Sequence, residues 1–165
     1  MSTHMDPRRH APQIPAQLQL AYQPIVCLSL GLTHGARAVA LHHPSTGPAP
    51  MAQVLALVAA GMGQAGPPAN VALDLPRQAL DGALPGLVER TLQRFGVLPT
   101  SISFALSAND AMADLRTTSS SVAALRSLGC EVGLSGVGAT FASVRLLHIV
   151  PIDFAELAPS AVDGL

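Results

Sequence analysis

The alternation of two kinds of apolar segment along the chain constrains its fold more than any other feature. Short runs rich in aliphatic and β-branched residues are typical of strands, and they alternate with segments whose apolar residues recur at helical spacing. We expect strands at residues 18–26, 36–41, 71–75, 101–106, 130–134 and 152–157, and helices at 51–60, 84–95 and around 122–128 and 141–147. This rhythm predicts an α/β fold with a mostly parallel sheet of about six strands.

Proline, glycine, serine and threonine residues mark where several of these segments begin and end. Pro85 stands in the first turn of the second expected helix, and Gly96 directly follows it, where a left-handed residue commonly ends a helix. The Ser and Thr residues at 117–121 are candidate caps for the next helix, and Gly129 is its expected end. Residues 61–69 contain three glycines and two prolines, which predicts a loop.

The composition excludes several classes of function. Hydrophobic residues make up 49% of the 165 residues and charged residues only 12%, so we expect a folded core rather than disorder. The net charge of −1 gives no excess of basic residues of the kind that nucleic-acid-binding domains commonly have. All nine basic residues are arginine, which excludes chemistry that needs a lysine amine. Aromatic residues make up 3% of the chain, so stacking platforms for single strands are not expected.

The chain divides into an expected flexible N-terminal arm at residues 1–17 and one folded domain at 18–165. The arm is polar and rich in proline, and no apolar export segment follows its Arg8-Arg9 pair. The longest apolar stretch, 54–60, is too short to span a membrane. We therefore expect a cytoplasmic protein without membrane insertion.

Three other features suggest ligand sites, but each favours a structural interpretation. Cys27 and Cys130 are far apart in apolar runs, as expected of lone buried thiols. His42 and His43 are adjacent, so on an extended segment they would point to opposite faces and could not easily share a metal. Residues 61–66 fit the pattern Gly-x-Gly-x-x-Gly. A dinucleotide-binding fingerprint must directly follow a strand, however, and these residues follow an expected helix. We expect no cofactor.

Six segments resemble, in order, the EAL domains, the bacterial phosphodiesterases that hydrolyse cyclic di-GMP. The first is Tyr22-Gln23-Pro24-Ile25-Val26, which is similar to the family's opening strand. The others are residues 35–44, 74–78, 102–109, 124–138 and 151–154, so the resemblance covers about residues 18–162. The resemblance implies a (β/α) barrel, but a closed eight-stranded barrel usually takes about 250 residues. We therefore expect an incomplete, truncated EAL-like barrel of about six strands.

The residues that carry the family's chemistry are replaced at almost every matching position. In the family, these positions hold metal-ligating and water-activating side chains. The matching residues here are Arg37, Asp74, Ala105, Ala108, Ser135, Gly136 and Glu156. Divalent ions need several convergent oxygen ligands at the C-terminal ends of the strands, and this set supplies too few. We expect no metal, no catalytic residue, and an ion pair between Arg37 and Asp74 that balances charge without metal.

These observations predict a catalytically inactive regulatory protein in bacterial signalling related to cyclic di-GMP. Open strand edges and apolar surface on an incomplete barrel would bind a protein partner or a second copy of the chain. The alternative is a receptor that binds cyclic di-GMP without hydrolysing it, with Arg37, Asp74 and Arg77 as nucleotide-binding residues. Because so few arginines lie near the site, we do not expect cyclic di-GMP among the ligands.

Overall fold

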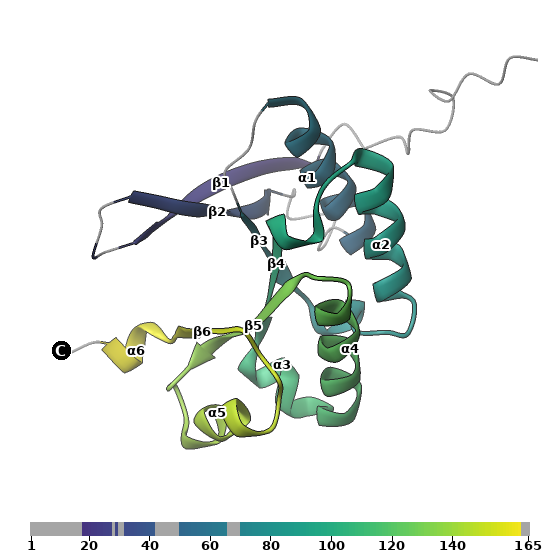
Figure 1. Ribbon diagram of the computed structural model, residues 1–165. Helices are drawn as coiled ribbons and strands as arrows, with labels where there is room; N and C mark the ends of the chain where they lie inside the picture. The colour runs from purple at the N-terminus through teal and green to yellow at the C-terminus, as the bar shows by residue number, and fades with distance from the viewer. Residues whose placement is uncertain (1–17, 28, 30–31, 42–49, 66–69, 163–165) are drawn as a thin grey trace, which may run out of the picture.

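One curled sheet organises the fold (Figure 1). The computed structural model describes residues 18–27, 29, 32–41, 50–65 and 70–162. Within these ranges, six strands lie in chain order across the sheet: β1 (Gln19–Cys27), β2 (Leu32–Leu41), β3 (Val71–Leu75), β4 (Ile102–Ser107), β5 (Glu131–Val137) and β6 (Phe154–Leu157). β1 is antiparallel to β2, and every later pair of neighbours is parallel. The predicted α/β fold with a mostly parallel, incomplete barrel sheet is confirmed.

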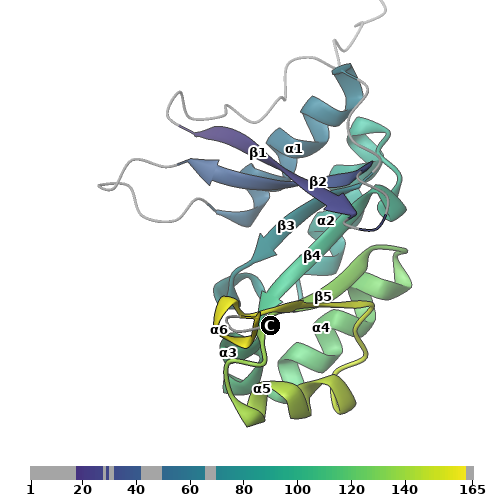
Figure 2. The ribbon, with the colours of Figure 1, turned by 90° about the vertical axis from the view of Figure 1, so that its left-hand side faces the viewer.

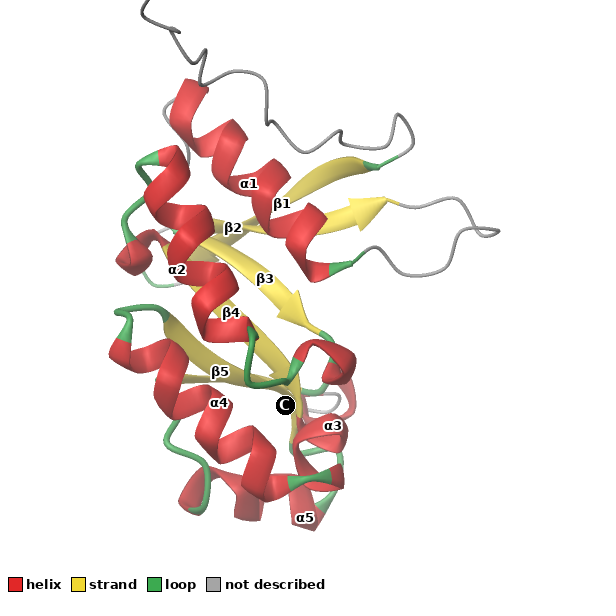
Figure 3. Cartoon of the chain, turned by 90° about the vertical axis from the view of Figure 1, so that its right-hand side faces the viewer, coloured by secondary structure: helices red, strands yellow, loops and turns green. Residues whose placement is uncertain are grey.

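Three helices cover the convex face of the sheet, and the strands lie uncovered on the concave side. The covering helices are α1 (Met51–Ala65), α2 (Leu84–Phe95) and α4 (Leu115–Ser127), which stand in front of the sheet in Figure 3. Figure 2 shows the strands from the opposite side. The shorter helices are α3 (Ala108–Ala113), α5 (Phe141–Arg145) and α6 (Pro159–Val162), with 3-10 turns η2 (Arg77–Ala79), η3 (Pro99–Ser101) and η4 (Leu146–His148). None of the helices in the described ranges is long and apolar enough to cross a bilayer.

The hydrophobic core lies between the sheet and its covering helices. Leu73, Phe104 and Leu134 point from the central strands into this layer and are fully buried, and Val88 and Leu92 of α2 pack against the same core. Because successive side chains of a strand face opposite sides, the residues between these face the concave side. They are small or polar: Ala72, Asp74, Ser103, Ala105, Gly133 and Ser135. This alternation places the candidate site residues on the concave face.

The predicted helix at 84–95 is confirmed at both ends, whereas the predicted loop after the first helix is partly wrong. Gly96 directly follows α2 with a left-handed φ of 66°, as expected of a helix-ending glycine. The loop expected at residues 61–69 was wrong for 61–65, because α1 continues to Ala65. The extra turn carries Met62 into the core, and this burial outweighs the weak helix propensity of the glycines around it.

The region between β4 and α4 also differs from the prediction. Residues 117–121 were expected to cap the helix but lie inside it, because Asp114 is the cap and its Oδ1 accepts a hydrogen bond from the Thr117 N–H at 3.1 Å. Thr118 is buried, and its hydroxyl donates to the Ala111 carbonyl at 3.3 Å, so it joins α4 to α3. The sequence analysis missed α3 because its six residues are too short for a helical period to show.

Cys130 is buried, as expected, and burial raises the pKa of its thiol to about 11. The helix expected around residues 141–147 ends at Arg145 and is followed by the 3-10 turn η4, in which His148 is exposed. The expected arm at 1–17 and the His42-His43 pair lie outside the described residues, as does the side chain of Cys27.

Candidate functional site

The candidate site lies on the concave face near the C-terminal ends of the parallel strands. Arg37 projects from β2, Asp74 from the end of β3 and Glu156 from the edge strand β6, so the three residues come from strands on both arms of the curled sheet. The strands between them contribute the small side chains Ala105 and Ser135. A cavity of about 490 Å³ opens here, and its apolar wall includes residues of β2, β3 and α1. We call this region the mouth.

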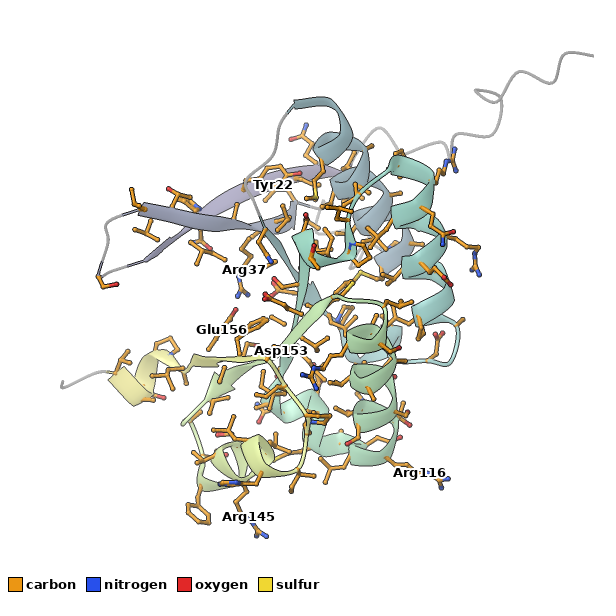
Figure 4. All side chains as sticks on the ribbon, viewed as in Figure 1. Tyr22, Arg37, Arg116, Arg145, Asp153 and Glu156 are labelled. Carbon is orange, nitrogen blue, oxygen red and sulfur yellow. The ribbon has the colours of Figure 1, made fainter. Side chains whose placement is uncertain are left out.

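Arg37 forms two ion pairs in the mouth. Its Nη1 donates to Asp74 Oδ1 at 2.6 Å, and its Nη2 donates to Glu156 Oε1. Figure 4 shows Arg37 of β2 and Glu156 of β6 pointing toward one another across the concave side of the curled sheet. The predicted ion pair between Arg37 and Asp74 is therefore confirmed. The second pair, with Glu156, was not predicted, because a sequence does not show how far the sheet curls.

The three charged side chains differ in their exposure to solvent. The Arg37 side chain is 21% exposed and that of Glu156 is 31% exposed, whereas the Asp74 side chain is 62% exposed. The pair between Arg37 and Glu156 is thus the better shielded of the two, and water screens it less. We call the two ion pairs together the Arg37 bridge.

The other predicted site residues divide into those that line the mouth and those that do not. Ala105 and Ser135 line it. Gly136 follows Ser135 with a left-handed φ of 74° and is exposed, whereas Ala108 is buried at the start of α3. Arg77 is exposed in η2 and is not among the residues that line the cavity.

The mouth contains one acidic residue that the sequence analysis missed. Asp110, in the first turn of α3, lines the cavity together with Asp74. Its position soon after the end of β4 is the signal that could have found it, because residues that follow parallel strands gather at the C-terminal edge of a sheet. Counted as ionised, Asp74 and Asp110 outnumber Arg37 among the described residues that line this cavity, and Glu156 adjoins it through its ion pair with Arg37.

The donor set of the mouth does not fit a divalent cation. The described residues contain no cluster of three or more His, Cys, Asp or Glu side chains that could hold a metal ion. Asp74 and Glu156 both bind the guanidinium of Arg37, and the neighbouring positions, Ala105 and Ser135, offer no carboxylate. Mg²⁺ and Mn²⁺ prefer several oxygen ligands around one point. Here the permanent cation of Arg37 lies between the two carboxylates instead.

A second polar cluster lies at the opposite, N-terminal end of the concave face. The Ser103 hydroxyl donates to Asn70 Oδ1 at 2.9 Å, and Asn70 Nδ2 donates to Glu131 Oε2 at 3.4 Å. A cavity of about 360 Å³ adjoins these residues, and Phe154 and Glu156 form part of its wall, so Glu156 lies between this cavity and the mouth. The bonds within this cluster join β3, β4 and β5 at their starts.

Asp153 anchors the start of β6. Its Oδ2 accepts hydrogen bonds from the Val132 N–H at 2.9 Å and from Arg126 Nε at 3.0 Å, and Arg126 Nη2 pairs with Asp153 Oδ1 at 2.8 Å. Burial alone would raise the pKa of Asp153, but the hydrogen bonds from Arg126 and Val132 and the charge of Arg126 outweigh it. The pKa of Asp153 therefore lies below its ordinary value. The sequence analysis did not single out this residue.

Comparison with known proteins identifies the family. The family model for the EAL domain matches residues 47–165, which is most of the chain. The chain belongs to the EAL family. None of the curated proteins is a significant match to it.

Solved EAL domains share the fold of this chain. The Xanthomonas citri FimX EAL domain in complex with cyclic di-GMP aligns with a TM-score of 0.76 at 18% identity, over 90% of this chain and 66% of that one. The FimX EAL domain from Pseudomonas aeruginosa bound to cyclic di-GMP aligns with a TM-score of 0.73 at 18% identity, over 87% and 66%. The PaMucR phosphodiesterase in its cyclic di-GMP complex gives 0.72 at 21% identity, over 86% and 66%. The chain thus spans about two thirds of the length of these EAL structures.

One expectation about ligands has to be corrected. From the small number of arginines near the site, we did not expect cyclic di-GMP among the ligands. This expectation is contradicted, because EAL structures that share the fold of this chain are complexes with cyclic di-GMP. The sequence argument counted charges and took no account of the cavity that the curled sheet encloses.

Proposed function

We propose that this chain is a non-hydrolysing EAL domain that acts in cyclic di-GMP signalling by binding. The observation that carries the proposal is the Arg37 bridge. Hydrolysis by metal ions needs carboxylates that are free to hold the ions and to activate water. In the mouth, Asp74 and Glu156 are both bound to a guanidinium, which leaves neither carboxylate without a partner.

Cyclic di-GMP is the ligand that we propose for the mouth. The support is the fold shared with EAL domains that are complexes with cyclic di-GMP, together with a cavity of about 490 Å³ at the C-terminal ends of the strands. Arg37 is the single cation among the described residues that line this cavity. Because a guanidinium can form two hydrogen bonds to one phosphate, Arg37 is the expected phosphate contact.

Isothermal titration of the purified chain with cyclic di-GMP tests this proposal. We expect heat of binding for the wild type and an affinity at least about tenfold weaker for Arg37→Gln, which removes the one cation that the described residues contribute to the mouth. Arg145→Gln is the matched control, because Arg145 lies on α5 and points away from the mouth in Figure 4. Absence of binding by the wild type at high micromolar cyclic di-GMP would contradict the receptor proposal.

A protein partner is the second candidate for what this domain binds, and a patch of exposed apolar residues favours it. Phe141 is 82% exposed, and Val144, Leu147 and Ile149 are also exposed along α5 and the turn after it. Apolar residues gathered on a surface in this way commonly mark interaction sites. Phe141→Ser with Leu147→Ser is expected to abolish capture of a partner and to leave cyclic di-GMP binding unchanged. Equal capture of a partner by this variant and by the wild type would show that the patch is not the surface that binds the partner.

A further inference from the structure

The attachment of β6 to the rest of the fold differs from that of the other strands. Among the described strands, β6 pairs with β5 alone, and the pairing is interrupted between Leu134 and Val137. Its outer face is exposed, with Leu157 at 59%. Each of the central strands β3, β4 and β5, in contrast, has a neighbour on both sides. β6 therefore depends on individual side-chain contacts more than these strands do.

Those contacts lie at the two ends of β6 and on its concave side. Asp153 anchors its start through Arg126 and the Val132 N–H. Phe154 packs over Gly133 of β5. Among the described residues, the ion pair between Glu156 and Arg37 is the one side-chain ion pair that joins β6 to β2, on the other arm of the curled sheet. Loss of this ion pair would leave β6 held by β5 and by its first residues alone.

A phosphate group that enters the mouth has to compete for Arg37. The guanidinium already serves two carboxylates, and Asp110 adds a third negative charge to the cavity. The two carboxylates occupy one N–H each of Nη1 and Nη2, so N–H donors remain for a phosphate. A phosphate bound to them would lie beside both carboxylates, however, and the repulsion between these anions favours the departure of one carboxylate. Asp74 lies on β3, which is held by neighbours on both sides, whereas Glu156 lies on β6, whose free edge and exposed outer face let it move. Displacing Glu156 from Arg37 therefore distorts the sheet less than displacing Asp74 would.

We propose that the Arg37 bridge holds β6 closed against the rest of the sheet, and that a phosphate of cyclic di-GMP releases β6 by taking the guanidinium from Glu156. The second half of this statement rests on the proposed receptor function. The ligand would thereby change the exposure of β6 and of α6 directly after it. Binding of the ligand in the mouth would thus change the surface that β6 and α6 expose at the edge of the sheet, and another molecule could bind to that changed surface.

Hydrogen exchange measured by mass spectrometry tests both halves on the full chain. Without ligand, we expect peptides that cover residues 152–158 to exchange about two- to fivefold faster in Glu156→Gln and Arg37→Gln than in the wild type. Arg145→Gln is the charge-matched control and should exchange like the wild type. Peptides from the central strand β4 report whether a variant has lost its overall fold, and Glu156→Gln keeps the size of the side chain.

The ligand is then added to the wild type at a saturating concentration. We expect exchange in 152–158 to become faster while exchange in β3 becomes slower or stays constant. Unchanged exchange in both variants without ligand would overturn the role of the Arg37 bridge. If cyclic di-GMP binds and exchange in 152–158 stays the same or becomes slower, the proposed release of β6 is overturned, but the receptor function is not. Failure of cyclic di-GMP to bind would overturn the receptor function and ligand-driven release together, and the bridge would still be judged by the variants alone.

Discussion

At the scale of single residues, one guanidinium occupies a place where acidic side chains converge. Arg37 satisfies Asp74 and Glu156 at once, and the pairs join three strands. A planar group with five donors can do this, whereas the single ammonium of a lysine could not hold both carboxylates in the same geometry. The charge on Arg37 is permanent, so the bridge does not depend on a metal supply.

Arg37→Glu tests this interpretation by reversing the charge. The variant would place a third carboxylate beside Asp74 and Glu156, so repulsion should destabilise the fold by about 1–2 kcal/mol without metal. We expect Mn²⁺ to bind the variant and restore part of the loss, because the three carboxylates supply oxygen ligands. The measurements are urea denaturation with and without Mn²⁺, and the electron paramagnetic resonance signal of free Mn²⁺.

Wild type and Arg37→Gln are the comparison proteins for this experiment. Neither should bind Mn²⁺ at the concentrations that saturate Arg37→Glu, because among the described residues two carboxylates, Asp74 and Glu156, contact position 37 and no third joins them in a cluster. Equal binding of Mn²⁺ by the wild type would show that the guanidinium does not replace the metal.

At the scale of elements, the contact between β5 and β6 depends on the absence of a side chain at Gly133. A Cβ built on Gly133 would lie 2.4 Å from the ring of Phe154 and 2.6 Å from the Phe154 carbonyl oxygen. Both distances are far below normal contact, and the carbonyl is backbone. The ring of Phe154 can therefore cover β5 only where the strand carries a glycine.

Gly133→Ala is accordingly expected to destabilise the fold by about 1–3 kcal/mol, because the added methyl group forces β5 and β6 apart. Urea denaturation monitored by circular dichroism gives the change in the free energy of unfolding. Gly82→Ala is the control, since a Cβ at Gly82 would meet nothing within 4 Å. An unchanged midpoint for Gly133→Ala would contradict the packing of Phe154 on this glycine.

The anchor at Asp153 should show in the pH dependence of stability. Its pKa is lowered from 3.8, so the ionised carboxylate stabilises the fold above pH 3.8, and this contribution is lost as the pH falls through the lowered value. We expect Asp153→Asn to cost about 1 kcal/mol at pH 7. The difference from the wild type should shrink in acid below that lowered pKa.

Urea denaturation at pH 7 and at several acidic values measures both effects. Glu89→Gln is the control, because Glu89 lies exposed on α2 away from β6. If the difference in the free energy of unfolding between the wild type and Asp153→Asn stays constant down to the pH at which Asp153 is fully protonated, the charge of Asp153 contributes nothing to stability.

Along the chain, the sequence predicted the elements that burial controls and missed those that tertiary contacts control. β3 and α2 match their predicted bounds, because apolar periodicity and a left-handed glycine act locally. The last turn of α1 was missed because the burial of Met62 depends on packing against distant parts of the chain, and α3 was missed because six residues are too few to show a helical period.

At the scale of the whole molecule, curvature determines which residues meet. The sequence identified Arg37, Asp74 and Glu156 as positions of interest, and it predicted the first ion pair. It could not bring Glu156 to Arg37, because the two residues are 119 positions apart and come from strands that are not neighbours in the sheet. Figure 1 shows how the curled sheet turns its two ends toward the same side. Asp110, in contrast, could have been found from its position three residues after the end of β4.

The central claim is that this EAL domain binds without hydrolysing, and one measurement tests it most directly. Purified chain is incubated with cyclic di-GMP and either Mg²⁺ or Mn²⁺, and the products are separated by chromatography. We expect the cyclic dinucleotide to remain intact over many hours at high protein concentration. Formation of the linear dinucleotide, in proportion to the protein added and lost in Asp74→Asn, would contradict the account.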